Sequence, residues 1–272
     1  MSKPPDYHIH TRFSSDCLVE MSEMCRAAVD RGLSEIGFTE HLDLDPGDAD
    51  LPPYRIEAWW EEIERCRHAF KGLLTIRAGI ELGEPHRYPK TVQGVLQRFP
   101  WDYALGALHW VDSELIFHEA YFQRSAERAY LDYFEELGRM AEAGGFDILA
   151  HLDVVKRYAV EHYGRYDPAR YEREIRGVLR TCVARGIALE VNTCTLRRPI
   201  GEMSPDRTVI DWYREAGGRW VTLGSDAHLA QDVGAGFDRA VATVQAAGFE
   251  HLARFERRQP SPLPRPAKPA SS

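Results

Sequence analysis

The sequence predicts an α/β fold built from parallel βαβ units. Seven short apolar segments with strand character recur along the 272 residues, and amphipathic segments of helix length separate them. Strands that alternate with helices in this way are typical of a parallel sheet, and α/β barrels of about this length commonly form a single domain. We therefore expect one domain over residues 1–258.

The strand candidates begin with "YHIH" near the N-terminus and end with "RWVTLGSDAH". In chain order they are residues 7–10, 35–41, 73–82, 102–109, 146–151, 187–192 and 219–228. Between them, apolar residues recur with helical spacing, and several of these segments end next to a glycine, as a helix C-cap does. The helix candidates are residues 21–31, 56–71, 126–143, 168–185 and 205–216.

Two long connections, residues 43–60 and 109–125, are rich in polar and aromatic residues. Loops of that length usually carry function or cover a site. Aromatic residues at such spacings more often pack in a core, but they are also candidates for covering a ligand. The candidates are Tyr54, Trp59, Trp110 and Phe117.

Composition excludes several classes of protein. The formal net charge of −8 argues against a long nucleic acid as partner, because binding to a phosphate backbone is usually driven by a basic surface. The five cysteines are odd in number and lack C-x-x-C spacing, so we expect neither a disulfide framework nor a cysteine zinc site. No apolar run is long enough for a signal peptide or a membrane span, and we expect a cytoplasmic protein. Residues 259–272 are rich in Pro and Ser without periodicity and predict a disordered tail.

Polar side chains follow the strand candidates at their C-terminal ends. His8 and His10 are two residues apart, so on a strand both imidazoles project from one face. In parallel β/α barrels these strand ends converge on one face, where active sites form. The polar residues at the ends are His8, His10, Glu40, His41, Glu81, His109, His151, Asn192, Asp226 and His228. Imidazole and carboxylate ligands suit zinc, iron or manganese, so we predict one polynuclear metal site.

Each of these residues also has a simpler explanation. A single histidine at the end of an apolar strand is more often a buried structural residue than a metal ligand. Six of the eleven histidines occupy such ends, however, and this recurrence favours ligation. Glu40 is equally compatible with a supporting or a solvated carboxylate, and Asp43 and Asp45 are most simply turn residues.

The chain carries an ordered set of motifs that resembles the PHP (polymerase and histidinol phosphatase) superfamily, and specifically its histidinol-phosphate phosphatases. The motifs are "HIH", "FTEH", "GIELGE", "GALHWV", "AHLDVVKR", "EVNTCTLRRP" and "TLGSDAH". The resemblance covers residues 6–248, and the combination is specific although no single motif is. It implies a distorted (β/α)7 barrel with three divalent metal ions at the C-terminal face of the strands.

The family pattern, matched position by position, implies the ligands of each metal. The first metal would take His8, His10, Glu81 and Asp226. The second would share Glu81 and add His109 and His151. The third would take Asp16, His41 and His228. Asp16 stands where many members have histidine, and its carboxylate shifts the site towards harder metals, so Zn, Mn and Fe all remain open.

Two basic pairs follow the fifth and sixth strand candidates. Lys156 and Arg157 lie in "VKR", and Arg197 and Arg198 lie in "TLRRP". Paired basic residues are usually solvated, but arginine suits bidentate phosphate contact, and the family uses arginines in these motifs. We therefore favour Arg157 and Arg197 as phosphate ligands and leave Lys156 and Arg198 open.

The resemblance implies hydrolysis of L-histidinol phosphate to L-histidinol and inorganic phosphate, a step of histidine biosynthesis. Phosphorus would be attacked in line by a hydroxide held between metal ions, without a covalent phosphoenzyme. The leaving alkoxide needs a proton or a metal, and the candidates for catalytic assistance are Asp226, His228 and Asp16.

Two other functions stay open from the sequence. The first is another PHP phosphoesterase, either a nucleotidase or a 5′ to 3′ exonuclease; the acidic charge argues against long polynucleotides but not against mononucleotides. The second is a metal- or phosphate-binding module without catalysis, which the presence of ligand candidates at all motifs disfavours.

Overall fold

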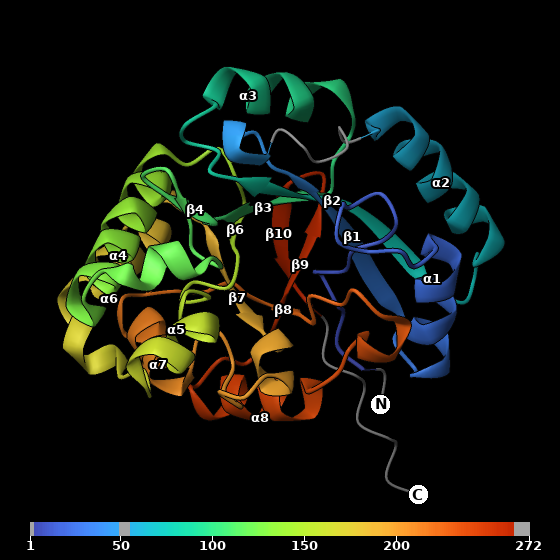
Figure 1. Ribbon diagram of the computed structural model, residues 1–272. Coiled ribbons are helices and arrows are strands. Elements are labelled where there is room, and N and C mark those ends of the chain that lie inside the picture. Colours follow the sequence, from blue (N-terminus) through green and yellow to red (C-terminus); the bar gives the residue numbers. More distant parts are fainter. Residues whose placement is uncertain (1–2, 49–54, 264–272) are drawn as a thin grey trace, which may run out of the picture.

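The computed structural model describes residues 3–48 and 55–263 of the chain. Its main sheet has six parallel strands in the order β1-β2-β3-β6-β7-β8. Their bounds are Glu35–Leu42 (β1), Thr75–Gly83 (β2), Tyr103–Ala107 (β3), Ile148–Leu149 (β6), Ala188–Asn192 (β7) and Val221–Gly224 (β8). The strands curl into a barrel wall, and the helices lie around the outside (Figure 1).

Helices follow most strands of the sheet, as parallel βαβ units require. In the part of the chain that the structure describes they are α1 (Met21–Asp30), α2 (Ile56–Ala69), α3 (Pro89–Arg98), α4 (Ala126–Ala143), α5 (Lys156–Tyr163), α6 (Glu172–Arg185), α7 (Arg207–Glu215) and α8 (Phe237–Ala246). The five predicted helices correspond to α1, α2, α4, α6 and α7. The sequence did not predict α3, α5 and α8, which have eight to ten residues each.

The N-terminal segment takes the place of a regular seventh strand. It forms isolated parallel bridges on both sides, from Asp6 to Ile36 of β1 and from Ile9 to Ala227 just after β8. Backbone amides reinforce both contacts: Gly37 N donates to Asp6 O at 2.7 Å, and Tyr7 N donates to Leu223 O at 2.9 Å. The predicted distorted α/β barrel is confirmed, with this irregular segment closing it between its first and last sheet strands.

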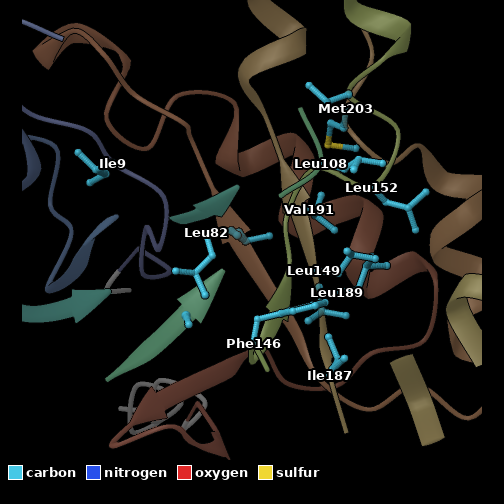
Figure 2. Close-up of a cluster of buried hydrophobic side chains, with 14 of the residues drawn as sticks. Ile9, Leu82, Leu108, Phe146, Leu149, Leu152, Ile187, Leu189, Val191 and Met203 are labelled. Carbon is cyan, nitrogen blue, oxygen red and sulfur yellow. The ribbon is translucent and has the colours of Figure 1, made fainter. Parts of the chain in front are cut away.

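Successive side chains along each strand point alternately into the barrel interior and towards the helices. On β6 and β7, Ile148 and Ala188 belong to the interior cluster, whereas Leu149 and Leu189 pack in the large cluster beneath the helices. Figure 2 shows part of that outer layer, where Leu149 and Leu189 lie close together. Because side chains on a strand alternate with period two, the same parity decides which polar residues reach the interior.

A C-terminal hairpin fills the base of the barrel. Strands β9 (Ala253–Glu256) and β10 (Gln259–Pro262) pair antiparallel and lie inside the ring of strands (Figure 1). Phe255 of β9 is 1% exposed and packs in the interior cluster with Tyr103 of β3. The metal-ligand candidates therefore occupy the opposite end of the barrel, at the C-terminal ends of the strands.

The hairpin corrects our expectation that a disordered tail begins at residue 259. Residues 259–262 form β10, and Leu263 N donates to Leu252 O at 2.8 Å. The turn residues Arg257 and Arg258 both have positive φ, and Arg258 N donates to Asp102 O at 2.8 Å. Contacts with a distant residue thus fix a turn that lacks the usual Asn-Gly signal. Residues 264–272 lie outside the described residues.

The two long connections differ in their structure. Residues 109–125 hold the short hairpin of β4 (Trp110–Val111) and β5 (Glu114–Leu115), followed by the 3-10 helix η2 (Glu119–Gln123). The connection over residues 43–60 is described only in part, and it ends in α2. None of the helices in the described ranges has the length and apolar composition needed to cross a bilayer.

Candidate metal centre

Most of the polar residues predicted at the strand ends meet at one end of the barrel. His41 on β1 stands in register with Glu81 on β2, so the sheet itself brings the two side chains together. His109 and His151 follow β3 and β6 by two residues, and Asp226 follows β8 by two. His8 and His10 come from the closing N-terminal segment, and both are completely buried.

Glu81 lies at the middle of the cluster. Its side chain is 1% exposed and is surrounded by five imidazoles. Oε2 lies 3.2 Å from His8 Nε2, 3.4 Å from His10 Nε2 and 3.0 Å from His41 Nδ1. Oε1 lies 3.0 Å from His151 Nε2 and 3.6 Å from His109 Nε2. Each oxygen of one carboxylate therefore faces a different set of histidines, which is the arrangement of a bridging ligand.

Asp226 and Asp16 complete the cluster on the side of His10. Asp226 Oδ1 lies 3.4 Å from His10 Nε2 and 3.5 Å from His228 Nδ1. Asp16 Oδ2 lies 2.9 Å from His228 Nε2 and 3.7 Å from His41 Nε2. The Asp16 side chain is 54% exposed, so this edge of the cluster faces solvent.

The donor atoms fit divalent metal ions. Among the described residues, four groups of three donors each lie within 4.8 Å of one another. The groups are His10, His41 and His228; His8, His10 and Asp226; His8, Glu81 and His151; and His41, Asp43 and His109. Several of these atoms are buried without a hydrogen-bond partner, among them His8 Nε2, His10 Nε2 and Glu81 Oε2. Buried polar atoms are usually paired, so their convergence, together with the mixed imidazole and carboxylate donors, fits bound cations such as Zn, Mn or Fe.

Two of the predicted ligands adopt an unusual backbone conformation. His151 has φ of +22° and Asp226 has φ of +52°, a region that residues other than glycine seldom adopt. Both follow the last residue of a strand by two positions. Such strain persists where the surroundings impose it, and it is commonly found at functional sites.

The charges of the cluster set the pKa values of its members. Burial alone raises the pKa of Glu81, but the charges of His8 and His41 outweigh it and hold that pKa well below its ordinary value. Burial also lowers the pKa of His109, yet the carboxylates of Asp43, Glu81 and Glu84 raise it to about 9. For His10, burial and the nearby charges of His228 and His41 lower the pKa to about 3, so this imidazole is neutral and ready to bind a metal at neutral pH.

Asp43 is not merely a turn residue. Its Oδ1 lies 3.4 Å from His109 Nδ1, and its Oδ2 lies 3.7 Å from His41 Nδ1. A side chain at Gly83 would meet Asp43 Oδ1 at 2.2 Å, so the absence of one there admits the carboxylate. The spacing of two residues from His41 is a local signal for Asp43, whereas its contact with His109 comes from two strands away in the sheet and leaves no such signal. Asp45, by contrast, accepts from Gly47 N at 2.9 Å, as a turn residue does.

Glu40 faces away from the metal centre because it is one residue out of phase with His41 on β1. Its carboxylate is buried and accepts hydrogen bonds from Thr11, Ser14 and Trp59. Ser14 Oγ is also 3.1 Å from His10 Nδ1. Glu40 therefore supports the loop that carries the N-terminal histidines, which is the first of the two roles that the sequence left open.

Arg197 lies next to Asp226, with its Nη2 3.5 Å from Asp226 O. Burial and the charge of Asp226 raise the pKa of the Cys194 thiol to about 11, and the charges of Arg157, Arg197 and Arg198 lower it. Arg197 Nη2 donates to Ser225 O at 2.8 Å. Arg157 Nε is buried without a hydrogen-bond partner.

Lys156, unlike the arginines, is not available to bind a phosphate. Its side chain is completely buried and lies 2.8 Å from Asp153 Oδ2, and Nζ also donates to Met203 O at 2.6 Å. This lysine fixes the start of α5 and has no exposed atom with which to meet a phosphate.

The four aromatic candidates for covering a ligand also differ in their positions. Trp59 and Trp110 are 0% and 8% exposed and belong to the interior of the protein, and Tyr54 lies outside the described residues. The Phe117 ring is partly exposed and lies 5.4 Å from the His109 ring and 5.1 Å from that of Tyr158. Phe117 is thus the candidate that borders the metal cluster.

Comparisons with known proteins agree with this geometry. The family described as PHP domain matches residues 6–194. A histidinol-phosphatase of Lactococcus lactis is 29% identical over 260 residues, covering 93% of this chain and 94% of that protein. A probable histidinol-phosphatase of Deinococcus radiodurans is 31% identical, covering 89% of this chain and 93% of that protein.

A solved structure shares the fold over nearly the whole chain. It is a crystal structure of histidinol phosphate phosphatase from Lactococcus lactis, complexed with zinc, L-histidinol and phosphate. The TM-score is 0.86 at 27% identity, and the match covers 96% of this chain and all of that one.

Metal binding should release protons and tighten as the pH rises. Because the pKa of His109 is raised to about 9 in the metal-free chain, its imidazole carries a proton at pH 7 that a metal must displace. Below that pKa the affinity should rise about tenfold per pH unit for each proton released. Competition with a chelator between pH 6.5 and 8.5, with calorimetry in two buffers, measures both quantities.

Two variants test the cause of this proton release. Asp43→Asn removes a carboxylate that raises the pKa of His109 and should make the pH dependence shallower. His68→Ala changes an exposed histidine on α2 and should leave the dependence as it is. Affinity that does not change with pH in the unaltered protein would contradict the assignment.

Proposed function

The chain belongs to the PHP domain family and, within it, to the histidinol-phosphatases, and from this premise we propose that it hydrolyses L-histidinol phosphate to L-histidinol and inorganic phosphate. This reaction is a step of histidine biosynthesis, and the protein is a phosphoric monoester hydrolase. The observation that carries the proposal is one buried carboxylate, Glu81, surrounded by five histidines, with Arg197 beside Asp226 at the edge of the same cluster.

We propose three divalent metal ions held by nine side chains. One ion would bind His8, His10, Glu81 and Asp226. A second would bind Glu81, His109 and His151. The third would bind Asp16, His41 and His228. When bound, such ions neutralise phosphate charge and make water acidic enough to act as a nucleophile at neutral pH. The crystal structure from Lactococcus lactis contains zinc, and we propose zinc, manganese or iron for this chain.

Arg157 and Arg197 supply the phosphate site in this proposal. Guanidinium groups bind the non-bridging phosphate oxygens in pairs and oppose the charge that develops in the transition state. Arg197 is held in place by the Ser225 carbonyl, and Arg157 has a buried Nε without a partner. Lys156 is excluded from the phosphate site by its complete burial with Asp153.

Asp16, Asp226 and His228 would assist the departure of the alkoxide, with His228 as the member that can carry a proton, because its pKa is raised while the pKa values of both carboxyls are lowered. His228 and Asp16 are 28% and 54% exposed and can exchange protons with solvent, whereas Asp226 connects them to His10. The broken bond joins phosphorus to the ester oxygen, so the proton must reach that oxygen as L-histidinol departs. Phe117 borders the cluster beside His109 and is placed to contact the departing molecule. A cytoplasmic location is part of the same proposal.

Substrate preference tests the proposed reaction. The protein, stripped of metal and reloaded with Zn, Mn or Fe, should release phosphate faster from L-histidinol phosphate than from a nucleoside monophosphate or a 5′-phosphorylated oligonucleotide. His10→Ala should abolish the release, because it removes a buried imidazole that faces both Glu81 and Asp226. A preference for a nucleotide or an oligonucleotide would reject the substrate and keep the metal centre, and no release with any metal would favour a binding module.

The two arginines should act on substrate binding. Replacing Arg157 or Arg197 with alanine should lower kcat/KM about 10- to 100-fold, the value of a charge-assisted hydrogen bond to phosphate. Arg165→Ala is the matched control, because that side chain is 85% exposed and pairs with Glu202. Steady-state kinetics with unchanged kcat/KM in both arginine variants would show that the phosphate binds elsewhere.

A further inference from the structure

Glu190 is a buried carboxylate directly beside the proposed ligands, and neither the family pattern nor the comparisons assign it a role. Its side chain is 1% exposed. Oε1 lies 2.7 Å from His8 Nδ1, and Oε2 accepts a hydrogen bond from the His151 backbone amide at 2.8 Å. Oε2 also accepts from Asn192 Nδ2 at 3.1 Å. One side chain therefore touches two of the residues that face Glu81.

The fold places Glu190 in this position through strand parity. Ala188, two residues earlier on β7, belongs to the interior cluster, so Glu190 also points into the barrel, one step closer to the metal centre. The neighbouring strand β8 leaves room for it, because a Cβ at Gly224 would lie 2.0 Å from Glu190 Oε1 and 2.6 Å from His8 Cβ. The pair of Glu190 and His8 thus fills space that any side chain at position 224 would occupy.

The contact with His8 decides which ring nitrogen faces the cluster. An ionised carboxylate only accepts hydrogen bonds, so at 2.7 Å the His8 Nδ1 must carry the proton and donate it. The lone pair of the neutral imidazole is then on Nε2, which lies 3.2 Å from Glu81 Oε2 and has no hydrogen-bond partner. A carboxylate behind a histidine ligand in this way fixes its ring and increases its basicity.

The contact with His151 holds a strained backbone. His151 has φ of +22°, which turns its ring towards Glu81 although the residue comes directly after the inward-facing Ala150. Its amide donates to Glu190 Oε2 rather than to a neighbouring strand. The same carboxylate thus orients one ligand through its ring and another through its main chain, and the two ligands face different oxygens of Glu81.

We propose that Glu190 is a positioning residue that presents His8 Nε2 and the His151 ring to the metal ions shared through Glu81. The proposal rests on the proposed function only in requiring a metal centre, not in the choice of substrate. Loss of Glu190 should weaken metal binding at this centre about 10- to 100-fold, the range known for supporting partners of metal ligands.

Metal affinity in the absence of substrate tests the proposal. Metal-free Glu190→Gln, Glu190→Ala and Gly224→Ala proteins are titrated with zinc against a chromophoric chelator, and thermal unfolding of the metal-free forms reports folding. Glutamine keeps the size but offers one acceptor oxygen for three donors, so we expect an intermediate loss of affinity. The zinc affinity of Glu190→Ala should fall about 10- to 100-fold, and that of Gly224→Ala should also fall.

Glu35→Gln is the matched control. Glu35 is a buried carboxylate at the opposite end of the barrel, where it accepts from Tyr7 and Arg77. Its substitution should lower stability without changing zinc affinity. Zinc affinity equal to that of the unaltered protein in folded Glu190→Ala would overturn the proposal. If the unaltered protein binds zinc but does not hydrolyse L-histidinol phosphate, only the proposed substrate is rejected.

A second measurement needs no variant. Nitrogen NMR of the zinc-loaded protein, labelled at its histidines, should show His8 protonated at Nδ1 and bound to metal through Nε2. The opposite arrangement, with Nδ1 bound to metal, would overturn the proposal even if every variant failed to fold.

Discussion

The arrangement of this protein depends on burying one carboxylate, Glu81, among five histidines. An isolated buried charge is costly, so the side chain is stable there only with positive or donor groups on both of its oxygens. Imidazoles supply them in the chain itself, and divalent cations satisfy the same demand more fully. The strand ends, the unusual backbone at His151 and Asp226, and the supporting carboxylates all serve to bring those groups to one position.

The segment that closes the barrel also carries two of the proposed metal ligands. The segment that carries His8 and His10 is bonded to β1 through Asp6 and Ile9 and to the other edge of the sheet through Tyr7 and His10. It has few regular ladder bonds of its own, so its position depends on both neighbours. Binding of a metal by His8, His10, Glu81 of β2 and Asp226, which follows β8, would therefore also tie the two edges of the barrel together.

The sequence alone predicted the position of a side chain where that position depends on a single strand. His41 and Glu81 could be placed because each lies near the end of its own strand, and parity explains why Glu40 does not join them. The sequence did not reveal the role of Glu190, which comes from a contact with His8, or the contacts of Asp43 with His109 and of Lys156 with Met203, because these partners are distant in the chain. The same holds for β10, whose turn is held by Asp102. Long-range contacts leave no periodic signal in a single sequence.

The central claim is that the metal ions share Glu81, and locating the ions tests it most directly. Diffraction from crystals of the zinc-loaded protein, recorded on both sides of the zinc absorption edge, gives the metal positions independently of the protein coordinates. We expect anomalous peaks within about 2.0–2.2 Å of both Glu81 oxygens, each also in contact with a histidine of the cluster. Peaks that leave either Glu81 oxygen without a metal would contradict a shared, bridging carboxylate.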